Sequence, residues 1–316
     1  MLTLHDVEPS RVDSDIRLFF KHDFANRRRR LDDWPTEAHL DLLCGRAGGL
    51  FIYAFATVKF TGHGGEYPRE QSDRILQAPK SSGYEGETVV KTKATLDSLY
   101  MSILQENFRG YDPGEYLRLR SIPGVVALAT DPLSPSAIAS LLGFGVDEVL
   151  LHLSLLHSLL IIQEDVDHPV QPFHRSPSDF IIDPTRCTDR MSCISPPDHH
   201  SELLIGCLKL MNQTLAVSAR RLEVDDSPEW TERCIDQALR CACGSWHKHL
   251  AKHTTRTPEI VSALHRSVEV KFSFWIQVLV ARMKNVANAL GAAKEWLREV
   301  CLVSGRMLDP HSSRPG

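Results

Sequence analysis

The sequence predicts a mainly α-helical protein with a helical N-terminal segment, a winged helix that carries a small β-hairpin, and a C-terminal helical bundle. Three observations lead to this fold class. Apolar residues recur at helical spacing along most of the 316 residues. Two short helices, the first with clear cap residues, are expected near the middle of the chain, and one pair of short strand-like segments follows them.

The length of the chain suggests two to three domains. The order of the expected elements divides the chain further. We predict a helical segment over residues 1–110, a winged-helix domain over 111–190, a helical bundle arm over 195–306 and a disordered tail over 307–316.

The N-terminal segment contains four stretches with helical character. The polar stretch 62–87 is rich in Gly, Ser and Pro, so we predict a loop there. In the last stretch, Leu96, Leu99, Tyr100, Ile103 and Leu104 repeat at helical spacing. The helices are expected at 12–24, 36–44, within 45–60 just after the Gly pair, and at 95–107.

The central segment has the pattern of a winged helix. A buried helix is expected over 122–130. Ser134 is placed to cap the next helix, Pro135 suits its first position, and Gly143 can end it in the left-handed conformation. A second helix over 147–156 precedes strands at 159–164 and 170–174 around a turn at 165–169.

The C-terminal segment reads as helical throughout. Leu203, Leu204, Cys207, Leu208 and Met211 fall on one face of its first helix. We expect helices at 199–215, 229–253, 258–265 and 268–303.

Composition excludes several classes of protein. The formal charge is −4 and the pI about 6.4, so no global basic field favours nucleic acid, and the run Arg27–Arg30 suits a solvated helix end as well as a basic patch. The longest apolar run, 149–162, is interrupted by polar residues, so no membrane helix is expected. Eight scattered cysteines and an N-terminus unlike a signal peptide favour the cytoplasm.

Two groups of residues could carry chemistry. Cys241, Cys243, His247, His249 and His253 have the composition of a zinc site, but they lack the spacing of one, so we predict core cysteines, solvated histidines and no metal. A nucleophile formed by Cys187 and His174 would lack an orienting group and an oxyanion hole. We therefore predict no catalytic residues and no enzymatic activity.

Six stretches of the chain carry a family resemblance. AGGLFIYAFATVKF, LDSLYMSIL, DPLSPSAIASLLG, FHRSPSDFIIDPTRC, CLKLMNQTL and CACGSWHKHL occur in this order within about residues 12–300. They resemble the C-terminal part of fungal NACHT-type signalling NTPases of the STAND class. The resemblance implies a helical lid over 1–110, a winged helix and a helical arm. The chain has no G-x-x-x-x-G-K-[ST], so we expect a truncated member without the ATPase core.

The resemblance implies two nucleotide contacts. Gly49, Leu50 and Phe51 match the lid segment near the adenine, with Phe51 where the class has Pro. His174 matches the histidine on the β-phosphate of ADP, with Arg175 where the class has Asp. ATP or ADP is expected as a ligand only if a P-loop core is supplied upstream or in trans. A histidine at a strand end can donate to a phosphate, although a hydrogen bond to Asp179 or to the backbone is the alternative.

These observations predict a non-catalytic regulatory or interaction region that couples nucleotide state to oligomerisation in full-length relatives. The surface that faces the ATPase core in such relatives would be exposed here, which favours protein partners or self-association. The alternative is a winged-helix nucleic-acid-binding protein, which the negative charge disfavours.

Overall fold

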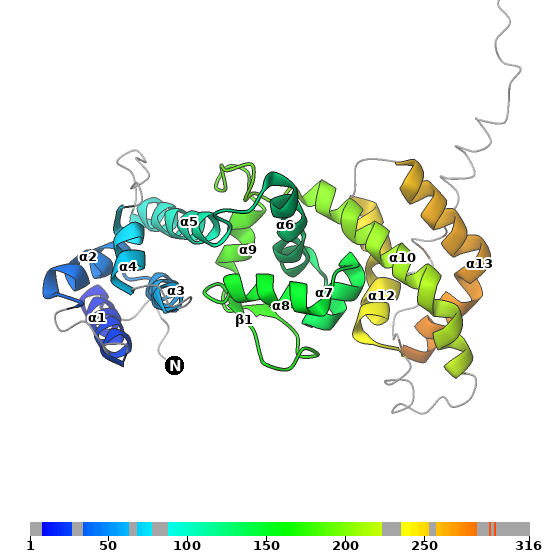
Figure 1. Ribbon diagram of the computed structural model, residues 1–316, viewed down its shortest axis with the longest axis horizontal. Helices are drawn as coiled ribbons and strands as arrows, with labels where there is room; N and C mark the ends of the chain where they lie inside the picture. Colours follow the sequence, from blue (N-terminus) through cyan, green and yellow to red (C-terminus); the bar gives the residue numbers. More distant parts are fainter. Residues whose placement is uncertain are drawn as a thin grey trace, which may run out of the picture. The chain divides into compact units, whose positions relative to one another are not determined.

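The computed structural model is mainly helical, as predicted, with one two-stranded hairpin in the described part of the chain (Figure 1). It describes residues 8–26, 34–62, 68–77, 88–222, 235–252, 257–282, 291 and 294. The chain forms two compact units. The first comprises Met1–Ala127 and Val146–Ser195, and the second comprises Leu128–Gly145 and Pro196–Gly316.

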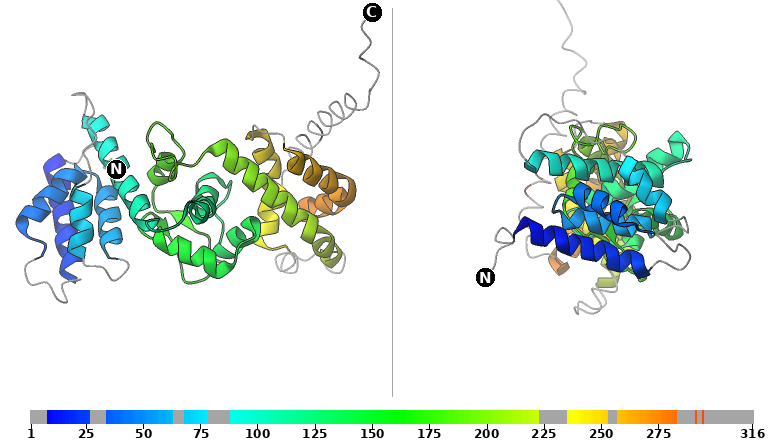
Figure 2. Two further views of the ribbon diagram at one scale, coloured as in Figure 1. Left: turned by 45° about the horizontal axis from the view of Figure 1, so that its top comes forward. Right: turned by 90° about the vertical axis from the view of Figure 1, so that its left-hand side faces the viewer.

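The first unit begins with helices that pack as one group (Figure 2). Phe20 stacks on Phe24, and Phe24 contacts Trp34, with ring centroids 5.6 and 4.6 Å apart. These rings are buried and form the core of the group. The helices are α1 (Pro9–Asn26), α2 (Glu37–Ala47), α3 (Phe51–Thr61), α4 (Pro68–Gln77) and α5 (Thr88–Asn107).

Helix α4 corrects the predicted loop at 62–87. Its sequence is polar, and Ile75 is its one large apolar residue in the buried core. It packs against α2, α3 and α5, and Gln71 and Ser72 are buried beside Ile75. A short helix of this kind is stabilised by tertiary packing more than by its own periodicity, which explains why the sequence alone did not reveal it.

Three further helices complete the first unit, and they differ in part from prediction. Helix α6 (Pro113–Leu128) starts nine residues before the expected helix at 122–130 and continues through Pro123. Helix α8 (Val146–Leu155) lies within one residue of its predicted bounds. Helix α9 (Ser176–Ile181) was not predicted.

The hairpin between α8 and α9 is shorter than expected. Strand β1 (Leu160–Ile161) pairs antiparallel with β2 (Gln171–Pro172), with Leu160 opposite Pro172. The predicted strands were five or six residues long. Proline lacks a backbone N–H and cannot extend the ladder, and a two-stranded ribbon adds little pairing energy of its own.

The second unit joins α7 (Pro135–Leu142) to α10 (Pro196–Leu222), and α10 also packs along α12 (Gln237–Lys252) and α13 (Pro258–Arg282). The predicted caps of α7 are confirmed. The Ser134 hydroxyl accepts the N–H of Ala137, and Gly143 ends the helix with φ of 70°. Gly206 of α10 lies so close to α7 that an added Cβ would meet the carbonyl oxygen of Leu141 at 2.3 Å.

Helix α13 corrects the predicted break between 265 and 268. It runs unbroken from Pro258 to Arg282, and the Ser267 hydroxyl donates to the Ala263 carbonyl oxygen at 2.9 Å along the helix. The predicted tail at 307–316 and the run Arg27–Arg30 lie outside the described residues.

The units are divided differently from the predicted segments. The predicted winged-helix span, 111–190, contributes α7 to the second unit and α6, α8, the hairpin and α9 to the first. In the part of the chain that the structure describes, no single helix is long and apolar enough to cross a membrane. Helices α7 and α8 reach the length and apolar composition of a membrane span only when taken together, and the chain bends by 115° between them.

Candidate functional site

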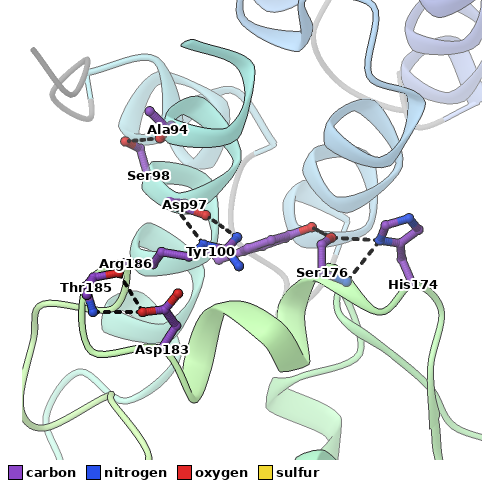
Figure 3. A network of polar contacts seen from close by, with 9 residues as sticks. All are labelled: Ala94, Asp97, Ser98, Tyr100, His174, Ser176, Asp183, Thr185 and Arg186. Atoms are coloured by element: carbon purple, nitrogen blue, oxygen red, sulfur yellow. Dashed lines mark hydrogen bonds and ion pairs between the residues drawn. The ribbon is translucent and has the colours of Figure 1, made fainter. Parts of the chain in front are cut away.

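His174 lies on an exposed turn between the hairpin and α9, where the chain leaves β2. Its Nδ1 is 3.0 Å from the backbone nitrogen of Ser176 and 2.7 Å from the Ser176 hydroxyl oxygen (Figure 3). The backbone N–H and the hydroxyl of one residue, Ser176, therefore hold the imidazole in one orientation.

The hydrogen bonds define the protonation pattern of the neutral His174 ring. A backbone N–H can only donate, so Nδ1 of His174 must accept and carries no proton. The proton of the neutral ring then resides on Nε2, and the Ser176 hydroxyl also donates to Nδ1. Since His174 is exposed, this arrangement presents the Nε2–H group to solvent as a hydrogen-bond donor.

Tyr100 of α5 anchors this turn from inside the first unit. Its hydroxyl is 2.7 Å from the Ser176 hydroxyl, across 76 residues of sequence. Because the Ser176 proton points to His174, Tyr100 is the donor in this pair. Burial raises the pKa of Tyr100 to about 12, against a smaller lowering by Ser176, so the phenol keeps its proton at neutral pH.

An ion pair holds the other end of α9 against α5. Arg186 donates to both carboxylate oxygens of Asp97, from Nε at 3.1 Å and from Nη2 at 2.6 Å. The two side chains are only 12% and 17% exposed. This hydrogen bond raises the pKa of Arg186, and its guanidinium also lies over the Phe180 ring at 5.7 Å.

Asp183 closes the turn that follows α9. Its carboxylate accepts the hydroxyl and the backbone N–H of Thr185 at 2.6 and 2.9 Å. These two bonds lower the pKa of Asp183. Figure 3 shows this turn beside the ion pair of Arg186 and Asp97. Helix α9 is thus tied to α5 by Tyr100 at one end and Arg186 at the other.

The predicted lid residues lie at the start of α3. Gly49 has φ of 79°, in the left-handed region, and Leu50 is the N-cap residue of the helix. Phe51 is 46% exposed, and its ring is 5.5 Å from that of Phe19.

Helix α3 connects Gly49, Leu50 and Phe51 to the hairpin. One turn after Phe51, Phe55 meets Phe173 edge-on with ring centroids 4.7 Å apart. His157 also lies 2.8 Å from the Lys59 carbonyl oxygen through Nε2. The segments carrying Gly49 and His174 are therefore parts of one packed assembly within the first unit.

The alternative role considered for His174 is partly correct. The backbone does hold the ring, but Asp179 is not its partner. Asp179 instead accepts from Nε of Arg175 at 3.2 Å in an exposed pair.

The Cys and His residues of α12 have a different arrangement from that predicted. Cys241 and Cys243 are buried, as expected, but His249 is 2% exposed and not solvated. Its Nδ1 lies 3.0 Å from Nδ1 of His200 on α10. Among the described residues, no group of three or more His, Cys, Asp or Glu could hold a metal ion, and His253 lies outside them.

Cys187 is buried, and burial raises its pKa to about 12, helped by the neighbouring Cys193. A thiol of this kind is a poor nucleophile because the thiolate is the reactive species. The roles of Tyr100, Ser176 and Asp97 were not predicted. Only Ser176, two residues after His174, gave a local signal.

No protein-family model matches this chain, and neither curated proteins nor solved structures give a significant match to it.

Proposed function

We propose that this chain is the non-catalytic regulatory region of a NACHT-type signalling NTPase, with a helical lid, a winged helix and a helical arm. In this proposal His174 senses the phosphate of a nucleotide bound to a P-loop core, and the arm transmits that state to protein partners in the cytoplasm. The observation that carries it is the hydrogen-bonded series from Tyr100 through Ser176 to His174.

This series gives His174 the properties of a phosphate sensor. An N–H donor that is already oriented loses little conformational entropy when an anion binds, and charge-assisted hydrogen bonds are stronger than neutral ones. The His174 ring is also linked to α5 through Ser176 and buried Tyr100. A displacement of the ring on phosphate binding would therefore be transmitted to a core helix. That coupling suits regulation rather than chemistry.

The apolar exposure of α1 to α3 supports the proposed protein partner. Leu18, Leu42 and Phe51 are 67%, 59% and 46% exposed. They lie on three helices of the same packed group, one of which begins with the lid residues. Apolar side chains mark a protein-binding surface where they lie next to one another, so we propose that these three contribute to one such surface.

The charge of the winged segment argues against the nucleic-acid alternative. Helix α8, which would enter the major groove, contains Asp147 and Glu148 and no Lys or Arg. The hairpin turn adds exposed Glu164, Asp165 and Asp167. DNA binding depends on cations that neutralise phosphates, so these carboxylates would repel the duplex.

Binding measurements with a NACHT-type P-loop domain added in trans test the proposal. We expect an ADP-dependent complex, detected by sedimentation velocity, that His174→Ala weakens by about tenfold through loss of one charge-assisted hydrogen bond. The matched control is His168→Ala, which removes another exposed histidine of the same hairpin and leaves the complex intact.

The proposal is wrong if the complex forms equally well without ADP or with His174→Ala. Steady ATP hydrolysis by the chain alone that survives repurification would also count against it, as would salt-dependent binding to duplex DNA. The last outcome would favour the winged-helix nucleic-acid reading instead.

A further inference from the structure

A pocket of about 310 Å³ lies in the second unit, between the loop before α7 and one face of α12. The loop supplies Asp131, Pro132 and Leu133, and the helix supplies residues at helical spacing from Gln237 to Lys248. Its volume falls at the lower end of the range for small-molecule sites.

Two cations on α12 border the pocket. Arg240 and Lys248 are both exposed and separated by eight residues, which corresponds to about 12 Å along a helix. Gly244 and Ser245 lie between them and leave the floor open because their side chains are small or absent. Among the described residues, neither cation has an ion pair or a side-chain hydrogen bond.

The charges around the pocket do not cancel one another directly. Asp131 on the opposite wall forms no ion pair with Arg240 or Lys248, although all three line the same space. Asp131 raises and Lys248 lowers the pKa of Cys241, which places both charges close to the pocket floor. The pocket therefore holds two positive charges and one negative charge around unfilled volume.

The wall of the pocket is held in place without a ligand. Gln237 accepts the backbone N–H of Ser134 at 2.8 Å and donates to the Pro132 carbonyl at 3.2 Å. Leu133 is buried, and Ser134 caps α7. A ligand would meet a formed site and would not have to order the loop, which favours affinity.

We propose that this pocket binds a small organic anion, with a phosphate or carboxylate group held between the Arg240 guanidinium and the Lys248 ammonium group. A guanidinium fork suits either group because it can donate two parallel hydrogen bonds. The polar remainder of the ligand would face Ser245 and Asp131, so a hydroxyl or amino group next to the anionic group fits the far wall.

Calorimetry with the full chain at low ionic strength tests this site, with inorganic phosphate, glycerol 3-phosphate and succinate as probes. We expect saturable binding of at least one probe in the calorimeter. In NMR spectra of the same titration, we expect changes in backbone amide chemical shifts that are confined to residues 131–134 and 237–248. Arg240→Gln and Lys248→Gln should each weaken binding by about tenfold. Asp131→Asn should tighten it, because a repulsive charge is removed. Comparing the two phosphate probes with succinate shows which anionic group the site prefers.

Arg266→Gln is the matched control, because Arg266 is an exposed cation of α13 in the same unit and does not line the pocket. It changes the net charge by the same amount and should leave binding unchanged. If none of the three probes binds saturably, the proposal is wrong. An equal loss in R266Q would also refute it, since binding would then follow the overall charge and not this pocket.

Discussion

His200 of α10 and His249 of α12 face each other through their Nδ1 atoms at 3.0 Å, and both rings are buried. A hydrogen bond between two Nδ1 atoms requires one ring to donate and the other to accept. The two rings therefore cannot carry a positive charge at the same time. Burial and the charge of His200 lower the pKa of His249 to about 4. Burial, with Lys252 and His199, lowers the pKa of His200.

This pair predicts a loss of stability in mild acid. In the unfolded chain each histidine takes up a proton near pH 6.5, whereas the folded state resists protonation until about pH 4 at His249. The contribution of His249 to the free energy of unfolding should therefore be complete above pH 6.5. It should fall by about 3 kcal/mol as the pH drops toward 4, because the unfolded chain then binds the proton and the folded chain does not. Urea unfolding followed by circular dichroism across this range measures the loss.

His249→Gln should flatten that pH dependence, because a neutral amide replaces the titrating ring. His168→Gln is the control, since His168 is an exposed histidine in the other unit. Lys248, Lys252, His199 and His247 also act on the pair and remain in every variant. An unchanged slope in H249Q would show that other groups cause the acid sensitivity.

The ion pair of Arg186 and Asp97 predicts a large effect of removing one partner. Arg186→Ala leaves the Asp97 carboxylate in a site that is only 17% exposed. We expect a loss of about 3 kcal/mol, because an unpaired buried charge costs far more than the pair contributes. Chemical denaturation of R186A, D97A and the double variant gives the coupling energy.

The exposed pair of Arg175 and Asp179 offers a comparison of the same chemistry nearby. These side chains are 87% and 46% exposed. Arg175→Ala should change the free energy of unfolding by less than about 0.5 kcal/mol because water screens such pairs. Equal losses in R175A and R186A would contradict the importance assigned to burial.

Gly206 predicts a steric defect on substitution. A Cβ at this position would lie 2.3 Å from the Leu141 carbonyl oxygen, so α10 or α7 must move. Gly206→Ala should destabilise the second unit by about 2 kcal/mol, as overpacking does elsewhere. Thermal unfolding measures the change.

Gly45→Ala makes the same chemical change on α2, where nothing lies within 4 Å of the added Cβ. It should stabilise the helix by about 0.5 kcal/mol, because glycine loses more backbone freedom on folding than alanine. A harmless G206A would mean that α7 and α10 are not held in close contact.

The cysteines should differ widely in reactivity. Cys207 and Cys243 are buried, and burial raises the pKa of both thiols, so little thiolate forms. Cys193 is only half-buried. Under native conditions iodoacetamide should label Cys193 well before Cys207 and Cys243, as peptide mass spectrometry can show. Rapid labelling of Cys207 would show that the contact between α10 and its neighbours opens readily.

Local features were predictable where neighbours in sequence determine them. The Ser134 cap and the left-handed Gly143 involve groups within a few residues of each other, so the bounds of α7 follow from the sequence. The apolar repeat in α5 likewise indicated the buried side of that helix, including Tyr100. His174 was identified as a candidate from the family resemblance and from its place at the end of the expected hairpin.

Its surroundings were not predictable in the same way. Tyr100 and Ser176 are 76 residues apart, and nothing local to either residue indicates that their hydroxyls meet at 2.7 Å. Burial of His249 was also missed, because it depends on His200 from another helix. The same holds for α4, whose polar sequence is helical because α3 and α5 surround it.

The chain by itself thus determined that the protein is helical, where several helices begin and end, and which turn carries the exposed histidine. Tertiary structure decided which buried hydroxyl anchors that turn, which histidine is buried and which cations border a pocket. The physical reason is the distance along the chain over which each interaction acts. Caps and periodicity act within a turn or two of helix, whereas burial and hydrogen bonding between helices exist only once distant segments have packed together.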